Sequence, residues 1–290
     1  MDDLTLKALL ASWSWRPEVL LVLVALGSVY ASGWWRLRAA GHRRLARRGR
    51  LAAYMAGLAV VAVALLSLVD HLAHVLLTAH MIQHLLLIMI AAPLLLLGNP
   101  LPTCLWGLPR KIRRPVGRLF VRSALPRKVL WAVTLMPVAW LLFVGNLWLW
   151  HLPAAYQAAL RDHLVHDLEH VAFFATAILF WWPIIEPAPR LHERIPRGFV
   201  ILYLIAATGQ NTLLGASIAL PSQVLYPYYA GSPPAVGQSA LDDQALAGAI
   251  MWTSGHMYLL PILLVVAKML DREERVMRQR QAVGGDQSGR

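Results

Sequence analysis

Cysteine is almost absent from this chain of 290 residues, which contains only Cys104. A single cysteine excludes a disulfide framework within the chain and any metal site built on a CxxC pair.

Charged side chains are also scarce, at 14% of the residues, whereas 58% of the residues are hydrophobic and the mean hydropathy is +0.53. This composition is typical of a multi-span membrane protein and not of soluble domains. Acidic residues are the rarer sign, which leaves a net charge of +12. The basic residues fall in short segments between apolar runs, where they set topology, so we expect membrane lipid and no nucleic acid as a partner.

Seven apolar runs approach the length of about 20 residues that a membrane-spanning helix requires. They cover residues 18–35, 51–69, 78–98, 131–150, 164–184, 198–220 and 245–267. We therefore predict an all-α fold, a polytopic membrane helix bundle of seven transmembrane helices formed by residues 1–267. We expect residues 268–290 to form a partly disordered tail, and residues 114–125 to form a short amphipathic helix on the inner leaflet. The start of the chain lacks the pattern of a cleaved signal peptide, so we expect it to be retained.

The distribution of lysine and arginine predicts the orientation of these spans. Segments 36–50, 99–130, 185–197 and 268–290 hold 24 of the 27 basic residues, and they alternate along the chain. The segments on the opposite side contain only Lys7, Arg16 and Arg161. By the positive-inside rule, the N-terminus lies outside and the C-terminus is cytoplasmic.

Histidine is concentrated on the predicted outer side. Only two of the eleven histidines, His42 and His192, lie in cytoplasmic loops. The other nine lie in outer loops, in the outer halves of spans or in the middle of a span: His71, His74, His80, His84, His151, His163, His166, His170 and His256. Ionisable residues within membrane spans are costly and indicate a functional site.

The spacing of these histidines favours a metal site. The pairs His80/His84 and His166/His170 are each four residues apart, so each pair shares one face of a helix and offers two imidazoles to one ion. We predict a metal site formed by these two pairs together with His151 and His256. We assign auxiliary roles to side chains near them: His74, His163, Met81, Gln83, Asp70 and Glu169.

The donor types indicate which metals fit. Imidazole nitrogens with Met81 close by favour copper, while zinc and haem iron remain chemically allowed. One alternative function is a seven-span zinc-dependent membrane hydrolase, in which three histidines and an acid activate water. A second alternative is a bis-histidine haem protein that takes one axial ligand from each of two helices.

Three stretches of the chain resemble the signature stretches of the multi-pass CtaG family of bacterial cytochrome c oxidase assembly factors. They are HMIQHLLLIMIAAPLLLLGNP, WHLPAAYQAALRDHLVHDLEHVAFF with the following LFWWP, and DDQALAGAIMW. The resemblance covers roughly residues 50–267, and the histidine blocks are its specific part.

This resemblance implies a multi-pass protein of the bacterial inner (plasma) membrane that helps copper to reach the oxidase and is an assembly factor, not an enzyme. It implies oxidase subunits or copper chaperones as partners. By motif match, it implies these functional residues: His80, Met81, Gln83, His84, His151, Pro153, Tyr156, His166, Glu169, His170, Asp243, Gln244 and Trp252. Its pattern does not clearly include His256, so the predicted role of that residue rests on its position alone.

Overall fold

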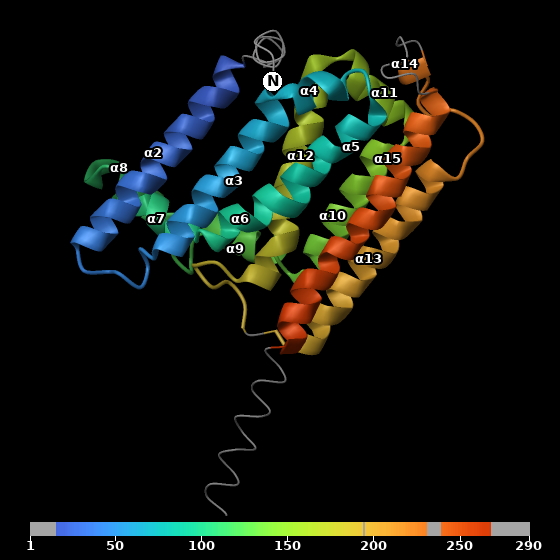
Figure 1. Cartoon of the computed structure of the whole chain (residues 1–290). Coiled ribbons are helices and arrows are strands. Elements are labelled where there is room, and N and C mark those ends of the chain that lie inside the picture. The colour runs from blue at the N-terminus through green and yellow to red at the C-terminus, as the bar shows by residue number, and fades with distance from the viewer. Residues whose placement is uncertain (1–15, 194, 231–238, 268–290) are drawn as a thin grey trace, which may run out of the picture.

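A computed structural model describes residues 16–193, 195–230 and 239–267. Every regular element in these ranges is a helix, and the long helices run side by side as a bundle (Figure 1). Six helices or helix groups are long and apolar enough to cross a membrane, or seven if one bent pair is counted as a single span. The six are α2 (Pro17–Ala39), α3 (Arg48–Leu66), the run Leu77–Leu97, α12 (His163–Ile185), α13 (Arg197–Ala219) and the run Ala240–Ala267, which begins with α15 (Ala240–Ser254). The protein is therefore an all-helical, multi-pass membrane protein.

Six of the seven predicted spans match these helices to within a few residues, but the fourth is not a straight helix. The predicted span 131–150 divides into α9 (Leu125–Val133) and α10 (Met136–His151), which are bent by 72° relative to each other. Pro137 lies in the first turn of α10. Proline has no backbone N–H and restricts the residue before it, so a helix running through this point is disfavoured. The predicted orientation of the termini stays a prediction. The predicted tail, residues 268–290, lies outside the described residues and also stays a prediction.

The third span changes its helical type along its length. It begins as α5 (Leu77–Leu85), continues as a π-helical segment η1 (Leu86–Ala91) and ends as α6 (Ala92–Leu97). Pro93, at the start of α6, cannot donate a hydrogen bond to the preceding turn. The indole N–H of Trp181 on α12 donates to the carbonyl of Ile88 at 2.9 Å, which provides that oxygen with a partner. π-Helical turns within α-helices often occur next to functional sites.

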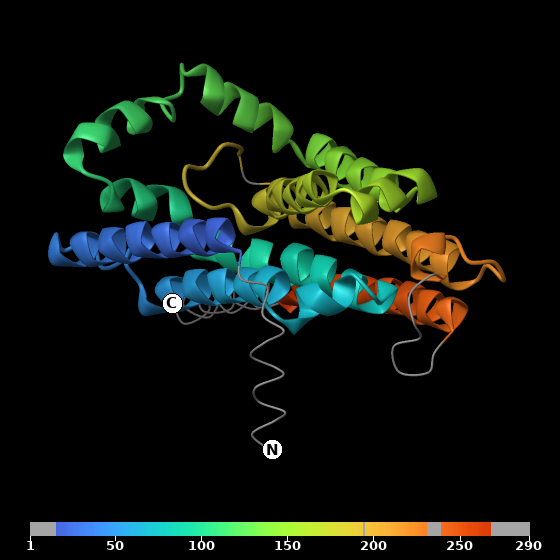
Figure 2. The same cartoon turned by 90° about the horizontal axis from the view of Figure 1, so that it is seen from above.

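The predicted amphipathic helix is found only in part. Helix α8 (Arg110–Arg118) follows α7 (Pro100–Gly107), and it ends before the second half of the predicted segment 114–125. No residue of α8 or α9 is buried. Seen from above, α8 and α9 form an arc that stands away from the other helices (Figure 2).

Helices α13 and α15 pack closely because glycines face each other across their contact. A Cβ on Gly215 would meet the backbone of Trp252, and a Cβ on Gly248 would meet the backbone of Ala219. Small residues at such contacts allow membrane helices to approach closely. This contact fixes α15, whose first turn reaches the site described next.

Three short helices lie at one end of the bundle, the upper end in Figure 1. They are α4 (Leu68–Ala73), α11 (Pro153–Arg161) and α14 (Pro227–Ala230). Helices α5 and α12 both begin at this end, so their first turns lie in the same part of the molecule as these short helices.

Candidate metal centre

Helix α5 carries His80 and His84, and its start is held by another helix. The residue before α5, Leu76, has no side chain that can cap the first N–H groups. The carboxylate of Asp243 on α15 instead accepts hydrogen bonds from the backbone N–H groups of Leu77 at 2.7 Å and Thr78 at 3.1 Å. A carboxylate is favourable there because the N-terminus of a helix carries a partial positive charge.

Helix α12 carries His166, Glu169 and His170 on one face. It is capped by its own sequence, since Asp162 accepts hydrogen bonds from the backbone N–H groups of Leu164 at 2.8 Å and Val165 at 3.3 Å. Positions i, i+3 and i+4 of a helix are neighbours on its surface. The three side chains are therefore presented together, and all three are buried.

These two helix faces meet. The ring centroids of His84 and His170 are 5.2 Å apart, and those of His80 and His166 are 5.3 Å apart. Two overlapping sets of side chains place ligand atoms within 4.8 Å of one another: His80, His84 and His170 in one set, and His80, His166 and Glu169 in the other. We call these five residues (His80, His84, His166, His170 and Glu169) the donor cluster.

The donor atoms of this cluster have no hydrogen-bond partner among the described residues. This applies to the Nε2 atoms of the four histidines and to both carboxylate oxygens of Glu169, all of which are buried. Leaving a buried polar group unsatisfied costs about 1–3 kcal/mol. The Nε2 atoms of His80 and His84 lie 3.8 Å and 3.7 Å from the Glu169 oxygens, too far for hydrogen bonds. Two atoms that each lie about 2.1 Å from one ion are separated by roughly 3–4 Å, so this spacing suits a metal ion.

A tyrosine fixes the orientation of the first imidazole. The hydroxyl of Tyr229 on α14 donates to the carbonyl of Ala73 at 3.0 Å and lies 3.3 Å from Nδ1 of His80. Because the single hydroxyl proton is used by the carbonyl, His80 donates to Tyr229 through Nδ1–H, and its Nε2 lone pair faces the cluster. Metal-binding histidines commonly donate their other ring N–H in this way. Burial raises the pKa of Tyr229, so its hydroxyl stays protonated.

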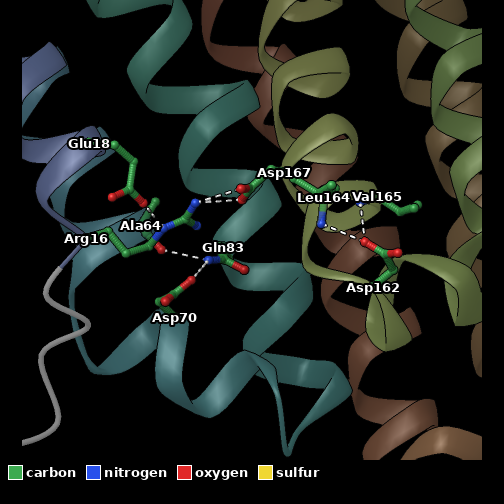
Figure 3. A network of polar contacts seen from close by, with 9 residues as sticks. All are labelled: Arg16, Glu18, Ala64, Asp70, Gln83, Asp162, Leu164, Val165 and Asp167. Carbon is green, nitrogen blue, oxygen red and sulfur yellow. Dashed lines mark hydrogen bonds and ion pairs between the residues drawn. The ribbon is translucent and has the colours of Figure 1, made fainter.

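A polar network lies beside the cluster and links neighbouring helices to one another (Figure 3). The side chain of Gln83 is fully buried and donates to the Ala64 carbonyl and to the Asp70 carboxylate, both at 2.8 Å. Beside it, Arg16 donates to both carboxylate oxygens of Asp167, each at 2.8 Å. The network ties α3, α4 and α5 together and joins the start of α2 to α12.

Two of the predicted ligands lie outside the donor cluster. His151, at the end of α10, is buried and donates through Nδ1 to the Leu147 carbonyl at 2.7 Å. It belongs to neither set of ligand atoms, and its ring packs against Phe173 and Tyr156. His256 is exposed, lies 3.0 Å through Nδ1 from the Thr253 carbonyl, and also belongs to neither set.

The predicted auxiliary residues take different positions. Met81 is fully buried in the core cluster that also contains Tyr156 and Phe173. Trp252 is exposed, and its backbone contacts Gly215. The remaining auxiliary residues lie in or beside the cluster: Asp70, His74, Gln83, His163, Glu169 and Asp243.

Sequence reasoning missed Tyr229 and Arg16. Tyr229 lies in the segment LYPYYA between two spans, where no spacing relates it to His80. Arg16 comes from the opposite end of the sequence to Asp167. Its only signal was its place among the few basic residues on the arginine-poor side.

Comparison with known proteins identifies the family. The family model for the cytochrome c oxidase caa3 assembly factor matches residues 28–272. An uncharacterized protein of Mycobacterium tuberculosis is 27% identical over 276 residues, which cover 92% of this chain and 41% of that protein. An uncharacterized protein of Mycobacterium leprae is 25% identical over 263 residues, which cover 88% of this chain and 39% of that protein.

The chain spans about two fifths of the length of these curated relatives. No solved structure matches it. The family match covers all five residues of the donor cluster and every span except the beginning of α2. The chain therefore belongs to the family of cytochrome c oxidase caa3 assembly factors.

Proposed function

We propose that this protein is a non-catalytic assembly factor of the bacterial inner membrane that binds a copper ion in the donor cluster and aids its delivery to cytochrome c oxidase. The ion is cargo in this proposal, and the oxidase or a copper chaperone is the partner that exchanges it.

The observation that carries the proposal is the set of buried donor atoms that have no hydrogen-bond partner in the part of the chain that the structure describes. Four imidazole nitrogens and one carboxylate converge from α5 and α12, and Tyr229 holds His80 in the tautomer that exposes Nε2. A cluster of this kind is costly in an apolar environment unless an ion or protons satisfy it. Imidazole suits copper well, and an oxidase assembly factor has a use for that metal.

The overlap between the two ligand sets supports transfer of the ion over permanent storage. His80 belongs to both sets, so an ion bound by His80, His84 and His170 can exchange two ligands and reach His166 and Glu169 without leaving His80. A structural metal site usually has a single closed set of ligands.

Metal analysis of the purified full chain tests the proposal. We expect about one copper per chain in the wild type after loading and washing, and loss of bound copper in the His80→Ala/His84→Ala and His166→Ala/His170→Ala variants. The matched control is His42→Ala/His192→Ala, which removes two histidines outside the cluster and should bind copper as the wild type does. The same variants, expressed in cells that lack the native protein, report on oxidase assembly.

Two results would contradict the proposal. One is a wild-type protein that retains no stoichiometric copper and whose cluster variants still support oxidase assembly. The other is stoichiometric zinc together with hydrolysis of a lipid substrate, which would favour the zinc hydrolase, since the same donor set can hold a zinc ion with an open position. A Soret band in the purified protein would instead favour a haem protein.

A further inference from the structure

The donor cluster is continued toward the end of the bundle by two more histidines. The ring of His166 lies 5.5 Å from the ring of His74, at the end of α4, and His74 lies 6.3 Å from His163, the first residue of α12. His163 is exposed, His74 is half-buried and His166 is buried. A continuous series of imidazoles therefore leads from the surface into the cluster.

The spacing of this series matches the reach of a shared ion. Two imidazoles that bind one ion through bonds of about 2.0 Å place their ring centroids up to about 6 Å apart. The steps from His163 to His74 and from His74 to His166 are 6.3 Å and 5.5 Å, and the next step, to His80, is 5.3 Å. An ion held by one of these rings is therefore within bonding reach of the next, given small side-chain movements.

The charges beside this route favour a cation. Asp167 follows His166 directly on α12, and Asp70 accepts a hydrogen bond at 2.8 Å from Gln83, which lies between His80 and His84 on α5. Arg16 occupies both oxygens of Asp167, whereas Asp70 is buried and receives only the neutral amide of Gln83 among the hydrogen bonds described above. An anionic carboxylate near the buried end of the route lowers the free energy of a passing cation.

The face of α12 that continues beyond His84 is apolar. The ring centroid of Phe173, on α12, lies 4.5 Å from that of His84. Ala177 and Phe180 follow on α12, and both are fully buried. These apolar side chains provide no ligand atoms. On the other side, imidazoles lead from His166 to His74 and on to the exposed His163.

We propose that His74 and His163 form an intake route along which a copper ion is passed by ligand exchange from the outer surface of the protein to the donor cluster. The inference rests on the proposed copper-binding function. In this proposal, the two histidines determine the rate at which copper enters and leaves the donor cluster. They do not belong to the set of ligands that hold the bound ion.

A loading experiment on the metal-free full chain in detergent tests the route. Copper(I) is supplied as a complex with a coloured chelator that is too large to enter the bundle, and loss of colour reports transfer. In the His74→Ala and His163→Ala variants, we expect the rates of loading and of removal by excess chelator to fall by the same factor. That factor should be about tenfold for the loss of one ligand contact on the path, with unchanged final stoichiometry and affinity.

His71→Ala is the matched control. His71 is an exposed histidine on α4, the short helix that ends just before His74. It should load at the wild-type rate. Thermal unfolding of each variant checks that the bundle is intact.

The outcomes separate the route from the site. Wild-type stoichiometry with wild-type rates in both route variants would overturn the route and leave the proposed function standing. A lower stoichiometry in His74→Ala would make His74 a resident ligand and would also overturn the route. A wild-type chain that takes up no copper would overturn both proposals.

Discussion

The carboxylate of Asp243 accepts a hydrogen bond at 2.7 Å from the backbone N–H of Leu77, the first residue of the helix that carries His80 and His84. Asp243 is only 4% exposed and lies on α15. This helix packs on α13 through Gly215 and Gly248. The position of the two imidazoles along the bundle therefore depends on a residue more than 150 positions away in the sequence.

Removal of this cap should loosen the start of α5. In Asp243→Ala, the buried N–H groups of Leu77 and Thr78 lose their acceptor, and we expect the free energy of unfolding to fall by about 1–3 kcal/mol. Copper affinity should fall with it, because His80 follows within the first helical turn. Asp243→Asn keeps one oxygen acceptor and should give an intermediate effect. Denaturation in detergent, followed by circular dichroism, measures the stability. Equal stability of all three proteins would contradict this account of the cap.

Substitutions of Gln83 and Arg16 should differ in their effects on stability. Gln83 is fully buried, and Gln83→Ala leaves the buried Asp70 carboxylate without this donor, so we expect a loss of about 1.5–3 kcal/mol. The Arg16–Asp167 pair is partly exposed, with side chains 26% and 41% accessible, so Arg16→Ala should cost less than about 1 kcal/mol. Unfolding measurements on both variants and on Asp167→Ala test this order. A larger loss for Arg16→Ala than for Gln83→Ala would show that the ion pair, and not the buried amide, holds this end of the bundle.

The glycine contact between α13 and α15 should tolerate no side chain. Gly248→Ala places a methyl group against the backbone of Ala219, and we expect a loss of about 1–3 kcal/mol from overpacking. Gly209→Ala is the matched control, since a Cβ there meets nothing within 4 Å, and it should be neutral or stabilising by up to about 1 kcal/mol. Thermal unfolding in detergent compares the two variants. Similar melting temperatures for both would argue against close packing of these helices.

The hydroxyl of Tyr229 should affect copper binding without being a ligand. Tyr229→Phe removes the acceptor of the His80 Nδ1–H, so the imidazole loses its fixed tautomer, and we expect copper affinity to fall about 10–100-fold. Competition with a chelator of known affinity measures the change. Tyr228→Phe removes a neighbouring hydroxyl that is only half-buried, and it should leave the affinity unchanged. Equal affinities for the two variants would remove Tyr229 from the account of the site.

Periodicity predicted the parts of the structure that are local in sequence. The spacing of His80 with His84 and of His166 with His170 defines two faces whatever surrounds them, and the structure places these faces against each other. Apolar length likewise predicted six spans with small errors at the ends. Pro137 indicates the bend between α9 and α10, whereas the mean hydropathy of a sequence window does not depend on such a helix break.

The rest depended on how helices are rotated and packed, which spacing within one helix does not determine. His256 lies in the middle of an apolar run, yet its imidazole is exposed and belongs to neither ligand set. Glu169 was assigned only an auxiliary role from the sequence, and the packing of α5 on α12 brings its carboxylate within 4.8 Å of the ligand atoms of His80 and His166. The contacts of Asp243 with α5 and of Tyr229 with His80 join segments that no periodic pattern relates.

The π-helical segment Leu86–Ala91 accommodates one additional residue within the third span. A π turn contains one residue more than an α turn, whereas an additional residue in a regular α-helix would turn everything beyond it by about 100°. The two helices on either side of the segment, α5 and α6, therefore keep nearly the same relative rotation that a regular α-helix would give them. Deleting one residue from this segment would restore a regular α-helix and leave His80 and His84 facing α12. The third span can thus change its length by one residue at this place without turning its ligands away from their partners.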